Sequence, residues 1–182
     1  METFFIEAGD PGGLPVVFIH GFPFSHALWR AQLSALGTGR RLIAYDVRGH
    51  GATPPDDGLY TIDLFVDDLI ALLDHLNIES AVLCWLSMGG YIALRAADRA
   101  PGRLRGLILA DTRAEPDANT GKFARVAAAK QIAEKGMGAF SEEFARNLFS
   151  PRSGGKPCVE DIKLILRATP PLGAGAGGRV VR

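Results

Sequence analysis

One serine in the chain stands where a buried strand is expected to turn sharply into a helix. The apolar run Ala81–Leu86 predicts a strand, and Ser87 follows it directly, before Gly89 and Gly90 at the start of a helix. A serine on such a turn holds its hydroxyl above the sheet, and the helix N-terminus below it favours developing negative charge. This arrangement suits nucleophilic attack on a carbonyl carbon, although a serine in this place can also serve simply as the N-cap of the helix.

Two other turns that contain polar residues follow apolar, strand-like runs earlier in the chain. The sequence His-Gly-Phe-Pro occupies residues 20–23, after the apolar run of residues 16–19. The sequence Asp-Val-Arg-Gly-His-Gly-Ala-Thr occupies residues 46–53, after the run of residues 41–45. Ligands bind at the carboxyl ends of the strands of a parallel sheet, so we expect both turns to lie near Ser87.

Together the three motifs resemble those of the α/β-hydrolase family, in the family's order, and most of all its esterase and 3-oxoadipate enol-lactonase branch. The resemblance covers about residues 3–168. It implies cofactor-free hydrolysis of a carboxylic ester or lactone, with Ser87 as the nucleophile. It also implies an oxyanion hole formed by the backbone N–H groups of Phe22 and Met88, each able to stabilise the tetrahedral intermediate by about 2.7–4 kcal/mol.

The same resemblance assigns residues 113 to about 168 to a helical lid that shapes the acyl pocket. Phe22, Phe24, Trp29 and Phe144 are candidates to line this pocket. For each of them, ordinary packing in the core is at least as good an explanation.

The chain departs from the family pattern at the turn itself. Trp85 stands where the Gly-x-Ser-x-Gly motif has its first glycine. An indole is expected to strain or displace a tight turn, by about 1–3 kcal/mol as at other strained sites. This interpretation predicts a higher melting temperature for the Trp85→Gly variant than for the wild-type protein.

A second departure concerns the general base. The triad of the family runs in the order serine, acid, histidine, but all four histidines of this chain precede Ser87: His20, His26, His50 and His75. A serine without a base within hydrogen-bond reach is a poor nucleophile, so activity is in doubt. Asp111 ends a strand on the correct side of the sheet and resembles the acid position of a minority of the family, although capping of the next loop explains it better.

The elements expected to position these groups alternate between strand and helix. Apolar runs predict strands at residues 3–7, 16–19, 41–45, 81–86 and 104–110. Between them, helical patterns begin at Ser25 and cover residues 62–76 and 87–100. The alternation predicts an α/β fold with a doubly wound, mostly parallel sheet, which is also the sheet that the family resemblance implies.

After Asp111 the pattern changes to three short helices, at residues 122–135, 141–149 and 159–168. We therefore divide the chain into the N-terminal part of an α/β-hydrolase core (1–112), a helical lid segment (113–169) and a Gly-rich flexible tail (170–182). The last strands of the family's sheet, with its usual acid and histidine, are missing, which suggests a C-terminal truncation. Strand 104–110 would then be an exposed edge through which the chain can self-associate.

Composition and motifs argue against several other classes of protein. The 20 Lys and Arg residues balance the 20 Asp and Glu residues, so charge suggests no nucleic-acid partner. Two cysteines, Cys84 and Cys158, do not make a disulfide framework. We find no signal-peptide pattern, no apolar run of about 18 residues and no metal-ligand or dinucleotide motif. We expect a cytoplasmic protein that contacts no membrane, with no metal and no cofactor.

Two functions remain open from the sequence. One is a serine hydrolase whose partner is a small-molecule ester or lactone. The other is a non-catalytic remnant of the hydrolase fold, which binds a small apolar ligand or a protein partner. Trp85, the lack of a histidine after Ser87 and the glycine-rich tail favour the second.

Overall fold

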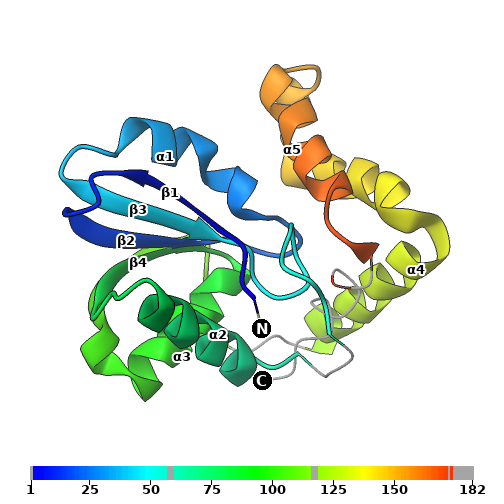
Figure 1. The fold of residues 1–182 in the computed structure, drawn as a ribbon. Coiled ribbons are helices and arrows are strands. Elements are labelled where there is room, and N and C mark those ends of the chain that lie inside the picture. The colour runs from blue at the N-terminus through cyan, green and yellow to red at the C-terminus, as the bar shows by residue number, and fades with distance from the viewer. Residues whose placement is uncertain (1, 57–59, 116–118, 172, 174–182) are drawn as a thin grey trace.

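A computed structural model describes residues 2–56, 60–115, 119–171 and 173 of the chain. Within these residues, five strands form one sheet in the order β1-β3-β2-β4-β5 (Figure 1). The strands are β1 (Phe5–Gly9), β2 (Leu14–Ile19), β3 (Arg40–Tyr45), β4 (Ala81–Leu86) and β5 (Leu104–Ala110). The α-helices are α1 (Arg30–Ala35), α2 (Ile62–His75), α3 (Met88–Arg99), α4 (Asn119–Leu148) and α5 (Pro157–Arg167). Short 3₁₀ helices are η1 (His26–Trp29), η2 (Pro101–Arg103) and η3 (Pro151–Ser153).

The sheet is mostly parallel, as the alternation of strands and helices predicts. β1 pairs antiparallel with β3, whereas β3, β2, β4 and β5 pair in parallel. The central strands β2 and β4 bring Val17 opposite Leu83, and both side chains are fully buried. Strands that are covered on both faces need continuous apolar sequence, which explains their composition. The carboxyl ends of the four parallel strands therefore lie at the same edge of the sheet.

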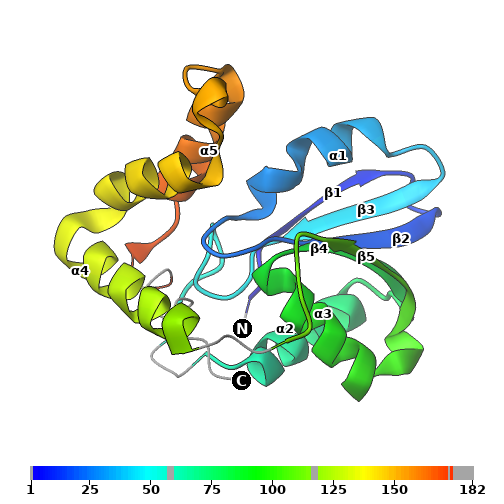
Figure 2. The same cartoon turned by 180° about the vertical axis from the view of Figure 1, so that it is seen from behind.

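Two apolar cores hold the sheet between its helices. On one face, α2 and α3 pack with residues such as Phe65, Leu69 and Ile92 against the sheet. On the other face, Trp29 and Leu33 of η1 and α1 form a smaller core with residues of β2, β3 and β4. Figures 1 and 2 show α1 on one side of the strands and α2 and α3 on the other. The doubly wound α/β architecture is confirmed.

The helices α4 and α5 do not cover either face of the sheet. In both views they lie beyond the carboxyl ends of the parallel strands (Figures 1 and 2). Gly136, with φ of 74° and ψ of 173°, divides α4 into two helical segments, so α4 and α5 contain the three predicted helices. Ile132, Met137 and Phe140 of α4 form a core of their own. Apart from residues 170, 171 and 173, the predicted flexible tail lies outside the described residues.

Trp85 lies inside the core and does not distort the turn after it. Its side chain is fully buried in the core beneath α2 and α3, and its backbone pairs in regular register with Ile19 and Leu109. The positive φ of this turn falls at Ser87 instead. The prediction of strain at Trp85 is therefore wrong, because the strand directs the indole into the core, where glycine would leave a cavity.

Candidate active site

Ser87 joins β4 to α3 in a strained backbone conformation. Its φ is 50° and its ψ is −112°, in a region that residues other than glycine seldom occupy. Hydrogen bonds hold this conformation: the Ser87 N–H donates to the Ala110 carbonyl at 3.2 Å, and the Gly90 N–H donates to the Ser87 carbonyl at 2.9 Å. The Thr112 hydroxyl donates to the same carbonyl at 2.9 Å. Ser87 is exposed. The turn that carries it is held by hydrogen bonds with β5, with α3 and with the Thr112 hydroxyl.

Two glycines allow the loop after β2 and the start of α3 to approach the turn closely. A Cβ atom on Gly21 would lie 3.1 Å from the Ser87 Cβ and 3.1 Å from the Leu86 carbonyl oxygen. A Cβ atom on Gly89 would lie 2.8 Å from the Ile19 carbonyl oxygen. Side chains at these two positions would push the loop and the helix away from the turn. The structure therefore brings the two predicted motifs, residues 20–23 and 87–90, into direct contact.

The predicted oxyanion donors flank this contact. Phe22 follows Gly21 in the loop, and Met88 is the first residue of α3. The first N–H groups of a helix have no acceptor within the helix, so the Met88 N–H is available to a ligand. The dipole of α3 also favours negative charge near this N–H group.

Aromatic side chains of α4 pack against the loop that carries Phe22. The Phe22 and Phe140 rings lie 6.4 Å apart, and the Phe24 and Phe144 rings lie 6.0 Å apart, both edge to face. After α5, the buried Thr169 hydroxyl donates to the Pro23 carbonyl at 2.7 Å. The helix α4 and the segment after α5 are therefore anchored on the loop of residues 22–24. No local pattern predicts the Thr169 hydrogen bond, because it joins residues far apart in the chain.

Among the four residues predicted as candidates for the pocket, Trp29 lies elsewhere. Its ring packs 5.1 Å from that of Phe18 in the core beneath α1. For Trp29, core packing is the explanation that the structure supports. Phe22, Phe24 and Phe144 do come together, and Phe140 joins them in the aromatic cluster.

Two histidines, His20 and His50, are buried near Phe22, and hydrogen bonds engage both ring nitrogens of His20. His20 Nδ1–H donates to the Gly21 carbonyl at 2.9 Å, and its Nε2 accepts the Val47 N–H at 3.0 Å. Burial, together with the nearby His50, lowers the pKa of His20 to about 3. His50 donates from Nδ1 to the Arg48 carbonyl, and burial lowers its pKa as well. Its Nε2 has no partner among the described residues.

The other two histidines have other roles. His26 Nδ1 lies 2.9 Å from both carboxylate oxygens of the buried Asp46, which also accepts the Ala52 N–H at 2.8 Å. This pair, which sequence reasoning missed, fixes the loop after β3. His75 lies at the end of α2, where its ring contacts Phe5. Within the described residues no histidine hydrogen-bonds to Ser87.

The burial of His20 and His50 predicts that the protein becomes less stable as the pH falls below about 6.5. The unfolded chain binds a proton on each histidine near pH 6.5. The folded chain does not protonate His20 until about pH 3. Between these values the unfolded state holds more protons, so His20 alone removes up to about 1.4 kcal/mol of stability per pH unit.

Urea unfolding at pH 6.5 and at pH 5 would measure this change in stability. The measurement would be made on the wild type, on His20→Gln and on His75→Gln, a change of an exposed histidine. We expect a loss of about 1.6 kcal/mol from His20 in the wild-type protein over this range, because the unfolded histidine is only half protonated at pH 6.5. His20→Gln should show a smaller slope, and His75→Gln should keep the wild-type slope. Equal slopes in wild type and His20→Gln would contradict the prediction.

Asp111 follows β5 directly, beside the turn. It has a φ of 42° and is exposed, and its neighbour Thr112 donates to the Ser87 carbonyl. The strands β4 and β5 thus bring Asp111 to the correct edge of the sheet. No hydrogen bond joins its carboxylate to a histidine within the described residues.

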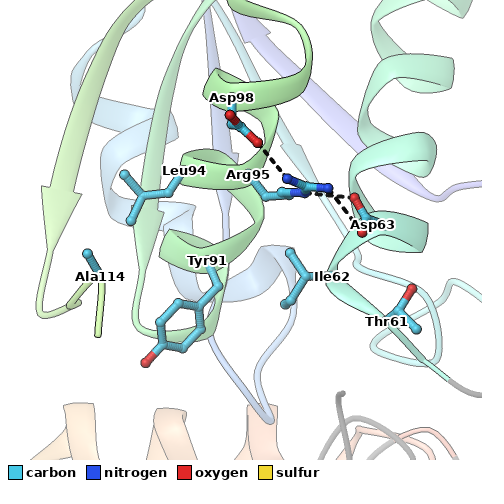
Figure 3. A pocket seen from close by; sticks show the side chains of 8 residues that line it. All are labelled: Thr61, Ile62, Asp63, Tyr91, Leu94, Arg95, Asp98 and Ala114. Carbon is cyan, nitrogen blue, oxygen red and sulfur yellow. Dashed lines mark hydrogen bonds and ion pairs between the residues drawn. The ribbon is translucent and has the colours of Figure 1, made fainter. Parts of the chain in front are cut away.

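A separate hollow of about 550 Å³ lies on the outer side of α3 (Figure 3). Its charged residues already pair with one another, since Arg95 bonds both Asp63 of α2 and Asp98 of α3. Tyr91, Leu94 and Ile62 supply apolar surface. Ser87, Phe22 and Met88 do not line it, so it is distinct from the candidate active site.

Among the described residues, no group of three or more His, Cys, Asp or Glu side chains is placed to hold a metal ion. None of the helices there is long and apolar enough to cross a membrane.

Comparisons with known proteins agree with this fold. The family described as alpha/beta hydrolase fold matches residues 15–155. Non-heme chloroperoxidase CPO-A1 of Kitasatospora aureofaciens is 45% identical over 112 residues, which are 60% of this chain and 40% of that protein. The 3-oxoadipate enol-lactonase 2 of Acinetobacter baylyi is 33% identical over 136 residues, 75% of this chain and 50% of that protein.

A solved structure gives the same result for the fold. A thermophilic esterase from Thermogutta terrifontis superposes with a TM-score of 0.90 and 36% identity, over 97% of this chain and 65% of that one. The chain thus spans half or less of the two curated relatives and about two thirds of the solved esterase.

Proposed function

The chain belongs to the α/β-hydrolase fold family, and from this premise we propose that it carries the nucleophile and the oxyanion hole of a serine hydrolase for carboxylic esters or lactones. The observation that carries the proposal is the strained Ser87 at the β4–α3 turn, with the Gly21 loop packed directly against it. A strained serine at this turn is the arrangement that exposes a nucleophilic hydroxyl above a parallel sheet.

In the proposed reaction, Ser87 Oγ attacks the carbonyl carbon of the substrate. The carbonyl π electrons move onto oxygen, and the N–H groups of Phe22 and Met88 stabilise that oxyanion. The C–O bond to the leaving alcohol then breaks, which leaves an acyl ester on Ser87 that water must hydrolyse. In each step a base must accept the proton of the attacking hydroxyl, from serine or from water, and return it to the leaving oxygen, and no histidine among the described residues hydrogen-bonds to Ser87 for this role. We therefore expect slow acylation, with Asp111 as the candidate acid should a base be supplied.

The substrate class rests on the relatives and on the aromatic cluster. An esterase and an enol-lactonase are among the similar proteins, and both names refer to the cleavage of a carboxylic ester or lactone. Phe22 contacts Phe140, so the surface next to the proposed oxyanion hole is apolar and aromatic. An apolar acyl group fits this surface better than a charged one.

The second candidate function is binding without catalysis. One observation favours it: His20 and His26 are both engaged in hydrogen bonds away from Ser87. In this case the fold would bind a small apolar ligand near the aromatic cluster, or a protein partner.

Covalent labelling with a fluorophosphonate probe separates the two candidates. We expect the folded wild-type protein to gain the mass of one probe molecule slowly, and Ser87→Ala to gain none. Ser34→Ala, a change of an exposed serine in α1, is the matched control and should label like the wild type. A folded wild-type protein that stays unlabelled would reject the hydrolase proposal and favour binding alone.

A further inference from the structure

Another hollow, of about 400 Å³, lies between the helix α5 and the loops that follow β2 and β3. One wall belongs to these loops and to the start of α1, and it includes His26 and Arg30. The opposite wall is α5, which contributes Asp161, Leu164 and Ile165. The proposed nucleophile and oxyanion donors do not line this hollow, so it is separate from the candidate active site.

The buried carboxylate of Asp46 fixes the ring of His26 in the wall of this hollow. The backbone N–H groups of His26 and Ala52 donate to Asp46 at 2.6 and 2.8 Å. Both carboxylate oxygens therefore act as acceptors, so His26 Nδ1, 2.9 Å from each of them, carries a proton and donates it. In the neutral ring, Nε2 is then left as a hydrogen-bond acceptor.

His26 Nε2 is the part of this ring that a ligand can reach. The side chain of His26 is 20% exposed, whereas Asp46 is fully buried behind it. Among the described residues, none hydrogen-bonds to Nε2. The ring of Phe4, with its centroid 5.0 Å from that of His26, further limits the orientation of the imidazole. A fixed acceptor in the wall of a hollow selects a ligand that donates a hydrogen bond.

The other side chains of the hollow favour a ligand that is neutral and mostly apolar. Arg30 and Asp161 lie on opposite walls, so their charges balance. Both are exposed, and an exposed charge attracts a charged group only weakly through water. Leu164, which is 59% exposed, and Ile165 supply apolar surface along α5. Neither an anion nor a cation is therefore the preferred ligand.

We propose that this hollow binds a small phenol, whose hydroxyl group donates a hydrogen bond to His26 Nε2 and whose ring packs on Leu164 and Ile165. A phenolic hydroxyl is more acidic than an alcoholic one and is therefore the stronger donor to an imidazole nitrogen. A cavity of about 150 Å³ already holds a benzene molecule, so the hollow has room for a phenol with substituents. Binding here needs no contribution from the chemistry at Ser87.

Titration of the ¹⁵N-labelled full chain with phenol and with anisole tests the proposal, followed by NMR at the histidine ring nitrogens. Anisole has the same ring as phenol, but a methyl group replaces the hydroxyl proton. We expect phenol to shift the Nε2 resonance of His26 and to bind at least about threefold more tightly than anisole, as one added hydrogen bond provides. The missing resonance in His26→Asn assigns that signal.

Two variants separate the contributions of the two walls. His26→Asn keeps a side-chain N–H group for Asp46 but has no acceptor in place of Nε2, so phenol should lose its advantage over anisole. Leu164→Lys removes apolar surface from the other wall and should weaken the binding of both compounds at least about threefold.

Two further variants are controls. Leu148→Lys changes a leucine that is 48% exposed on α4, outside the hollow, and should bind phenol like the wild type. Ser87→Ala should do the same, because the proposed site does not include Ser87.

Circular dichroism establishes that each variant is folded, and the comparison of phenol with anisole on the wild type needs no variant. The proposal is overturned if the two compounds bind the wild type equally or if phenol leaves the His26 resonance in place. It is also overturned if folded His26→Asn still prefers phenol. Binding of phenol to Leu164→Lys as tightly as to the wild type would place the phenol elsewhere and overturn it too.

Discussion

Replacement of Trp85 by glycine should lower the free energy of unfolding by at least about 3–5 kcal/mol, the range found when a buried aromatic side chain is truncated. The indole is fully buried between the sheet and the helices α2 and α3. Glycine would leave a cavity there and would add backbone freedom to the unfolded chain. Urea unfolding monitored by circular dichroism at pH 7 measures the change.

The control for this prediction is Trp85→Phe. Phenylalanine keeps most of the aromatic volume and removes the indole N–H, which has no hydrogen-bond partner among the described residues. We expect a loss below about 1.5 kcal/mol, as for other swaps that conserve volume. A Trp85→Gly protein that is as stable as the wild type, or more so, would show instead that the indole strains the turn.

Imidazole in solution should raise the rate at which the fluorophosphonate probe labels Ser87. The strained turn is in place and the proposed oxyanion donors flank it, but no histidine among the described residues hydrogen-bonds to Ser87. A positioned base contributes about 10²–10⁴ to such a step. A base that arrives by diffusion should recover part of this factor, and we expect about a tenfold increase or more.

Two comparisons control this experiment. Ser87→Ala should remain unlabelled with imidazole present, which excludes labelling at other side chains. Lowering the pH until imidazole is protonated should abolish the increase, because the imidazolium ion cannot accept the serine proton. Fast labelling that does not depend on imidazole would mean that the chain contains a base that the described residues do not show.

The amino-acid sequence by itself determined the layered fold and the place of the proposed chemistry. Continuous apolar runs require strands covered on both faces, and the helical spacing between them requires parallel crossovers. The sequence also predicts that the turn of residues 20–23 lies near Ser87, and the close approach at Gly21 and Gly89 confirms this. Both predictions succeed because they depend on local pattern and on the common edge at which parallel strands end.

Only the tertiary structure decided the roles of Trp85 and of the histidines. A sequence motif shows only that Trp85 replaces a glycine of the family pattern. Whether the indole strains the turn depends on where its side chain points. It points into a core formed with helices that are distant in the sequence. The same holds for His20: burial lowers its pKa, and its hydrogen bonds to Gly21 and Val47 occupy both ring nitrogens. Such contacts join residues far apart in the chain, so burial and hydrogen bonding become visible only when the chain is folded.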